Sequence, residues 1–192
     1  MDEAAQVLNK PGSLAVIPTD TVYGVVARAQ DIEAVKRLYK LKSRENKPGT
    51  LIAASIDQLV ELGLKRRYLT AVEQYWPGAV SVIIPSSDPA LAYLHQGKMS
   101  LATRIPNDKN LRALLEKTGP LITSSANQPT EPPAVNIQQA KAYFGDKVDY
   151  YLDGGELKDR QPSTVIRIID DAVEVIRQGA VKIDEQTGKI ST

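Results

Sequence analysis

The stretch Leu14-Ala-Val-Ile-Pro-Thr-Asp-Thr-Val-Tyr-Gly24 joins a continuous apolar run to a polar turn. Residues 14–17 are all apolar, which is typical of a strand covered on both faces. Pro18 ends this strand because proline has no N–H to donate to a sheet ladder. The turn then places hydroxyl and carboxyl groups at the carboxyl end of the strand: Thr19, Asp20, Thr21 and Tyr23.

This turn has two interpretations. Ligands of open α/β sheets bind just outside the carboxyl ends of strands, so the polar groups favour a binding site. An ordinary turn, whose Thr and Asp side chains bond their own backbone, explains the same residues.

The rest of the chain alternates strand-like and helix-like segments, which predicts a single α/β domain with a mixed β-sheet and flanking helices. Helices are expected over residues 2–9, 31–41, 57–63, 70–75, 90–95, 107–117 and 136–144. Strands are expected over residues 14–17, 25–27, 50–54, 79–84, 100–105, 120–123, 150–152, 163–169 and 172–177, the last two forming a hairpin. The strand at 50–54 closes a βαβ unit and is expected to be parallel. We predict one domain over residues 1–183 and a frayed polar tail over 184–192.

Composition narrows the class of protein. The chain has 192 residues, of which 42% are hydrophobic and 24% charged, as in soluble globular proteins. No apolar run is long enough to cross a bilayer, so we expect no membrane association and a cytoplasmic location, which the absence of cysteine fits. The single histidine, His95, excludes a His-based metal cage and argues against a Ser-His-Asp hydrolase. We expect His95 at a helix end on the surface. The net charge of +1 gives no argument for nucleic-acid binding.

Two further polar clusters follow strands or helices. Lys42, Arg44 and Lys47 combine a forked donor with point charges, which suits a phosphate. A solvated helix C-terminus, where cations are favoured anyway, is the better explanation of this cluster taken by itself. The segment 122–127 carries Ser, Thr and Asn groups that suit a ribose, a phosphate or a carboxylate, or an ordinary Ser/Asn turn.

A fourth cluster comprises Ser100 and Arg104, which are four residues apart on one strand and therefore share a face. An arginine on a half-buried strand needs a carboxylate partner, either a protein Asp or Glu or a ligand. The sequence contains no Walker A motif, no G-x-G-x-x-G and no Gly-x-Ser-x-Gly elbow. A nucleotide site in this chain would therefore bind the phosphates with residues outside these motifs.

Taken together, these residues resemble the YrdC family, whose signatures are a P-T-[DE]-T-x-Y-G turn, a K-x-R pair and an S-x-N triplet. They stand here as Pro18 to Gly24, Lys42 with Arg44, and Ser125 with Asn127. Further matches are Trp76-Pro-Gly78, Arg104 in an Arg-Ile-Pro segment, Ser163-Thr-Val165 and Ile176-Arg-Gln-Gly179. The matches appear in family order over about residues 14–179.

The resemblance implies a twisted α/β sheet with a concave cleft. It implies a nucleotidyltransferase that combines L-threonine, bicarbonate and ATP into L-threonylcarbamoyladenylate and pyrophosphate. A partner threonylcarbamoyl transferase would then modify tRNA, with a contact to tRNA itself as a further expectation. Magnesium is expected to arrive with ATP, and no metal is expected to be held by the protein alone.

The resemblance also implies site residues. L-Threonine would be held by Thr21, Tyr23, Arg104, Thr123 and Ser163. ATP and its phosphates would be held by Lys42, Arg44, Lys47, Ser100, Ser125, Asn127 and Arg177. Lys42 and Arg44 are the expected catalytic residues, because they would offset charge on the departing pyrophosphate. Glu45 stands where the family usually has proline, and Gln128-Pro-Thr130 replaces the common Ser-Gly after S-x-N.

Three other functions compete with this one. An RNA-binding module predicts salt-sensitive RNA affinity and indifference to threonine, although the near-neutral charge and 5% aromatic content disfavour it. A paralogous carbamoyl-adenylate enzyme with a different acceptor would keep the same K-x-R and S-x-N residues. An inactive relative that serves as a binding protein is disfavoured by the retained cationic residues.

Overall fold

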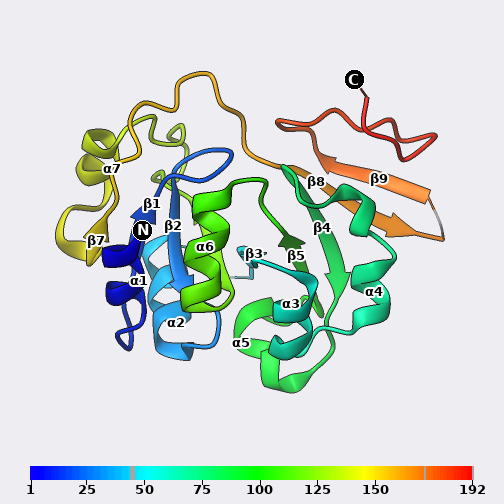
Figure 1. The fold of residues 1–192 in the computed structure, drawn as a ribbon, viewed down its shortest axis with the longest axis horizontal. Helices are drawn as coiled ribbons and strands as arrows, with labels where there is room; N and C mark the ends of the chain where they lie inside the picture. Colours follow the sequence, from blue (N-terminus) through cyan, green and yellow to red (C-terminus); the bar gives the residue numbers. More distant parts are fainter. Residues whose placement is uncertain (44–45, 171, 192) are drawn as a thin grey trace.

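The computed structural model describes residues 1–43, 46–170 and 172–191 (Figure 1). Within these residues, nine strands form one mixed sheet in the order β7-β1-β2-β6-β3-β5-β4-β8-β9, which confirms the predicted fold class. The strands are β1 (Ala15–Ile17), β2 (Gly24–Arg28), β3 (Thr50–Ile52), β4 (Val80–Pro85), β5 (Ser100–Arg104), β6 (Leu121–Ser125), β7 (Tyr150–Tyr151), β8 (Thr164–Ile169) and β9 (Ala172–Arg177). The helices are α1 (Asp2–Leu8), α2 (Ile32–Leu41), α3 (Ile56–Leu62), α4 (Arg66–Thr70), α5 (Ala92–His95), α6 (Lys109–Thr118) and α7 (Ile137–Phe144), with 3₁₀ turns η1 (Glu73–Tyr75), η2 (Pro89–Leu91) and η3 (Gly145–Lys147).

Side-chain caps begin four of the helices. In α2, α3, α6 and α7 the residue before the helix accepts a hydrogen bond from the backbone N–H three positions later. These caps are Asp31, Ser55, Asp108 and Asn136. Each satisfies a donor that a helix start otherwise leaves unpaired, so the short polar residue sets the first turn.

The helix predicted over residues 70–75 is wrong. The chain forms α4 before it and the short turn η1 within it. The buried residues here are Leu69, Val72 and Tyr75, which recur at every third position. That spacing matches the three residues per turn of a 3₁₀ helix better than the 3.6 of an α-helix.

The strand β6 enters the sheet between β2 and β3 and is antiparallel to both. β2 and β3 therefore run parallel, as predicted, but they are not neighbours. β8 pairs with β9 as the predicted hairpin, and β1 pairs with β2 as an antiparallel hairpin that was not predicted. The turn between β1 and β2 thus lies at the same end of the sheet as the end of β6, since Gly24 pairs with Ser125.

The two faces of the sheet are covered unequally. On one face, apolar residues of α2, α3, α4 and α5 pack against the inward-pointing residues of the strands, including Val25, Leu51 and Leu101. On the other face, α1 and α6 pack against Ile17, Val26, Ile52 and Leu121. Figure 1 shows α6 lying across the middle of the sheet. Toward β5, β4 and β8 this second face carries smaller and polar side chains instead.

The C-terminal tail is folded back, so the prediction that it is frayed is wrong. The hydroxyl of Tyr75 donates to the carbonyl of Gly188 over 2.7 Å, and the backbone N–H of Val175 donates to Glu185 over 3.0 Å. Ile183 is buried and forms a bridge with Ile190. The tail therefore packs beside β9, as the red segment of Figure 1 shows, because apolar and backbone groups hold it despite its polar composition.

His95 is also placed differently from the prediction. Its side chain is 2% exposed, and its Nδ1 accepts from the backbone N–H of Gly97 over 3.2 Å. The residue ends the single-turn helix α5, which packs on the sheet and carries His95 inward with Leu94. None of the helices in the described residues is long and apolar enough to cross a membrane.

Candidate active site

A row of side chains crosses the part of the second face that α6 leaves open. Thr50 of β3 pairs in register with Thr123 of β6 on one side and with Ala102 of β5 on the other, and Ala102 pairs with Ile83 of β4. Residues paired in register point to the same face of a sheet. These four side chains form the floor of a cavity of about 280 Å³.

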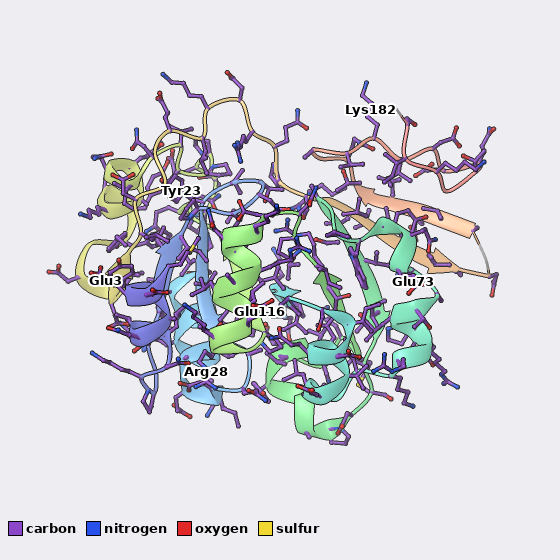
Figure 2. The ribbon with its side chains drawn as sticks, in the orientation of Figure 1. Glu3, Tyr23, Arg28, Glu73, Glu116 and Lys182 are labelled. Atoms are coloured by element: carbon purple, nitrogen blue, oxygen red, sulfur yellow. The ribbon has the colours of Figure 1, made fainter. Side chains whose placement is uncertain are left out.

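The cavity collects most of the expected site residues. All five expected for L-threonine line it, together with two of those expected for ATP: Thr21, Tyr23, Arg104, Thr123, Ser163, Ser125 and Arg177. The turn between β1 and β2 forms one wall, where Figure 2 labels Tyr23, and the segment 162–163 forms another. Pockets for drug-sized ligands span roughly 300–1,000 Å³, so this volume suits a small ligand.

The turn between β1 and β2 is held by its own hydroxyls. Thr19 donates to the carbonyl of Val22 over 2.6 Å, and its Oγ1 accepts from the N–H of Thr21 over 3.2 Å. The Oγ1 atoms of Thr19 and Thr21 lie 3.0 Å apart, within hydrogen-bonding distance. The ordinary-turn interpretation is therefore correct for the bonds that Thr19 makes, and Thr19 and Thr21 both line the cavity as well.

Tyr23 is a wall residue whose hydroxyl is already engaged. The hydroxyl accepts from the N–H of Gly154 and donates to the carbonyl of Gly155, both over 2.8 Å. Burial raises the pKa of Tyr23, and the nearby Asp153 charge adds to this against the lowering effect of the Gly154 bond. The phenol therefore stays protonated and ties the turn to the connection between β7 and β8.

Gly24 allows β2 to approach Thr123 closely. A Cβ at this position would lie 2.6 Å from Thr123 Oγ1 and 3.6 Å from Thr19 Cγ2. A contact under 3.0 Å forces one of the groups to move, so only glycine leaves the Thr123 hydroxyl in its place. The glycine that ends the P-T-D-T-V-Y-G stretch thus shapes the cavity.

Arg104 has a carboxylate partner inside the protein. Its Nη1 donates to Oδ1 of Asp20, and the side chains of Arg104 and Asp20 are only 3% and 8% exposed. The other carboxylate oxygen of Asp20 accepts from the backbone N–H of Asn107 over 3.2 Å. The Nε of Arg104 is buried and has no hydrogen-bond partner among the described residues. Arg104 lines the cavity, so its guanidinium brings a positive charge to that space.

A second arginine borders the opposite wall. The guanidinium of Arg177 donates through Nη2 to the carbonyl of Ser163 over 2.7 Å, and the residue is exposed. The hydroxyl of Ser163 lies 2.9 Å from that of Ser81, which is fully buried. Arg177 is therefore bonded to Ser163 at the rim of the cavity, and the buried Ser81 contacts the Ser163 hydroxyl.

Lys42 of the K-x-R motif meets the S-x-N motif next to the cavity. The ammonium of Lys42 donates to the carbonyl of Ser125 and to Oδ1 of Asn127, each over 2.8 Å, and also to the Asn127 carbonyl. The Ser125 hydroxyl donates to the same Oδ1 over 2.8 Å. Ser125 lines the cavity, whereas Lys42 and Asn127 are not part of its lining. Arg44 and Glu45 lie outside the described residues.

Two other expected ATP residues lie away from the cavity lining. Lys47 is exposed on the loop before β3, where its neighbour Pro48 does line the cavity. The Ser100 hydroxyl donates to the carbonyl of Lys98 over 3.3 Å at the start of β5. Ser100 shares a face with Arg104, as the spacing predicted, but it lies one strand length away from it.

Sequence reasoning missed three residues of this site. Asp20 was noted in the turn but not as the partner of Arg104, and Ser81 and Thr50 were not singled out. Ser81 interrupts the apolar strand 79–84 at a position that alternates with Val80 and Val82. A polar residue on the otherwise apolar strand was the available signal, because alternation places it opposite the core face.

The arrangement suits a small ligand that carries a carboxylate. Arg104 offers a buried cationic donor, Thr21, Thr123 and Ser163 offer hydroxyls, and the floor is apolar at Ala102 and Ile83. No group of three or more His, Asp or Glu side chains that could hold a metal ion occurs among the described residues.

Comparisons with known proteins match this fold and its motifs. The family model described as "Telomere recombination", which covers Sua5, YciO and YrdC proteins, matches residues 7–179. A threonylcarbamoyl-AMP synthase of Marinobacter nauticus is 33% identical over 163 residues, which are 82% of this chain and 86% of that protein. A threonylcarbamoyl-AMP synthase of Bacillus subtilis is 29% identical over 182 residues, which are 92% of this chain and 53% of that protein.

A solved structure of a Sua5 protein also matches this chain. Sua5 of P. abyssi, crystallised in complex with L-threonine, superposes with a TM-score of 0.84 and 29% identity, covering 96% of this chain and 55% of that one. The fold and the cavity define an α/β protein with a small-ligand site on one sheet face. The chain belongs to the Sua5/YciO/YrdC family.

The close approach at Gly24 yields a stability prediction. Gly24→Ala places a Cβ 2.6 Å from Thr123 Oγ1, so we expect the free energy of unfolding to fall by about 1–3 kcal/mol in urea titrations. In the double variant Gly24→Ala/Thr123→Ala the clashing oxygen is absent, and the total loss should be smaller than the sum of the two single losses. Additive losses would contradict the contact.

Proposed function

We propose that this chain is a threonylcarbamoyl-AMP synthase, an enzyme of the nucleotidyltransferase type, and that the cavity is its L-threonine site. The relatives with that name support the activity. The observation that carries the site is the buried Arg104 guanidinium, which lines the cavity together with a set of hydroxyls. An amino acid carboxylate is the complement of such a group, because guanidinium and carboxylate form short charge-assisted hydrogen bonds.

In this proposal the amino acid lies across the floor of the cavity. Its carboxylate meets Arg104, while the hydroxyls of Thr123, Thr21 and Ser163 bond its polar groups. The apolar floor at Ala102 and Ile83 offers a contact for the methyl group that distinguishes threonine from serine. Such a methyl contact discriminates modestly, by roughly 10–200-fold.

ATP would approach from the rim where Ser125 and Arg177 lie. Lys42, Arg44, Lys47, Ser100 and Asn127 are the further residues proposed for ATP. Magnesium would enter with ATP as the counter-ion of its phosphates. Lys42 lies beside this rim with its ammonium directed at the 125–127 segment, from which it can offset charge on a departing pyrophosphate.

The reaction has two bond-forming steps. The deprotonated threonine amine attacks the carbon of bicarbonate and water leaves, which gives a carbamate. A carbamate oxygen then attacks the α-phosphorus of ATP, the bond to the bridging oxygen breaks, and pyrophosphate leaves with the electron pair. None of the residues expected at the cavity has the character of a general base, so we assign catalysis to positioning and electrostatics.

The product then requires an acceptor. We propose that a separate threonylcarbamoyl transferase passes the group to tRNA, and that this chain works in the cytoplasm, where ATP and tRNA are present. A direct contact between this chain and tRNA belongs to the same proposal.

The first test is pyrophosphate release from ATP with magnesium and bicarbonate, with and without L-threonine. We expect release that depends on L-threonine, with serine clearly poorer. Release without any amino acid would instead indicate another carbamoyl acceptor. No release with any amino acid, together with salt-sensitive RNA affinity, would favour an RNA-binding module.

Two variants separate the two halves of the site. Arg104→Ala should weaken L-threonine binding at least 100-fold and change ATP binding less than threefold, as measured by calorimetric titration. Lys42→Ala should raise the KM for ATP about tenfold through loss of a phosphate-facing charge, and change L-threonine binding less than threefold. Each variant is the control for the other. Equal loss of both ligands in Arg104→Ala would refute its assignment to the amino acid.

A further inference from the structure

Asp20 is the carboxylate that contacts Arg104, and it has no role in the function proposed above. Both of its oxygens are occupied by protein donors, since Oδ1 accepts from Arg104 Nη1 and Oδ2 accepts from the N–H of Asn107. Its side chain is 8% exposed. The carboxylate is therefore held in place from two sides and joins the turn after β1 to the end of β5.

Asp20 and Arg104 line different cavities. Arg104 lines the cavity of about 280 Å³, and Asp20 does not belong to that lining. Asp20 lines a second cavity of about 460 Å³, which shares Thr21 with the first. Asp20 therefore contacts the cavity-lining Arg104 without lining the first cavity itself.

The guanidinium is planar, so fixing one nitrogen largely fixes the directions of its other N–H groups. Asp20 binds Nη1, and Arg104 lines the cavity. A ligand carboxylate in the cavity would therefore meet a guanidinium whose orientation is already set. The pair also balances a charge that burial alone would disfavour.

We propose that Asp20 is a positioning residue for the amino acid substrate. It holds the guanidinium of Arg104 in the orientation in which it meets the substrate carboxylate, and it acts only through Arg104. This inference rests on the proposed function, because it takes the ligand of the first cavity to be an amino acid.

The test is the Asp20→Asn variant, which keeps the shape of the side chain and an acceptor for Asn107 but removes the charge that anchors Arg104. In steady-state assays of pyrophosphate release, we expect the KM for L-threonine to rise at least tenfold. We expect kcat to fall less than threefold and the KM for ATP to change less than twofold. This split between KM and kcat separates positioning from general loss of structure.

Asp149→Asn is the matched control. Asp149 also accepts from an arginine, Arg37 Nη1 over 2.5 Å, and from a backbone N–H, Leu14 over 2.8 Å, but it does not line the cavity. We expect its KM for L-threonine to stay within twofold of the wild type. A double-mutant cycle with Arg104→Lys adds a second check, because Asp20→Asn should change kcat/KM less than twofold in that background.

Three results would overturn the inference. An unchanged KM for L-threonine in Asp20→Asn, with only a lower melting temperature, would make Asp20 purely structural. A lower KM would show that Asp20 competes with the substrate carboxylate. Losses that multiply in the Arg104→Lys background would show that Asp20 acts independently of Arg104.

A second measurement covers the case in which Asp20→Asn does not fold. In the wild-type protein, NMR of the Arg104 guanidinium should give separate Nη1 and Nη2 signals at 25 °C before any ligand is added, because Asp20 restricts its rotation. One averaged signal would overturn the inference. This measurement needs no enzymatic activity. Absence of threonine-dependent pyrophosphate release in the wild type would refute the proposed function, and the NMR signals would still test whether Asp20 holds Arg104.

Discussion

The buried ion pair between Asp20 and Arg104 joins two segments on which the cavity depends. Asp20 belongs to the turn after β1 and Arg104 ends β5, and three other strands separate β1 from β5 in the sheet. Removing one partner of a buried pair typically costs about 3–5 kcal/mol, because the other charge is left uncompensated. The pair therefore fixes the turn over the open face of the sheet and directs a cationic donor into the space between them.

The cavity exists because two properties change along one face of the sheet. The helices α1 and α6 cover only part of that face, and the side chains on the uncovered part include smaller ones. Where α1 and α6 lie on the sheet, the face is closed by large apolar residues such as Ile52 and Leu121. Beyond α6, Thr50, Thr123 and Ala102 occupy the same face and leave volume above them. The contact between Lys42 and the 125–127 segment then holds the polar end of β6 at the edge of this volume.

The sequence predicted the fold class and most of the cavity because these depend on local signals. Strand alternation and capping residues are signals that lie within a short stretch of sequence. The motifs that predicted Arg104 and Thr123 as site residues are local in the same sense. The protein partner of Arg104 was one of two open alternatives, since a pairing between distant segments has no local signature. The insertion of β6, the burial of His95 and the folded tail depend on tertiary packing in the same way.

The most direct measurement follows the ¹H–¹⁵N resonances of the Arg104 guanidinium during titration with L-threonine. Arg104 lines the cavity, so a bound carboxylate should form charge-assisted hydrogen bonds with its N–H groups. We expect a downfield shift of guanidinium resonances that saturates with the dissociation constant measured by calorimetry. Saturable binding of L-threonine that leaves every Arg104 guanidinium resonance unchanged would contradict the claim that this cavity holds the amino acid through Arg104.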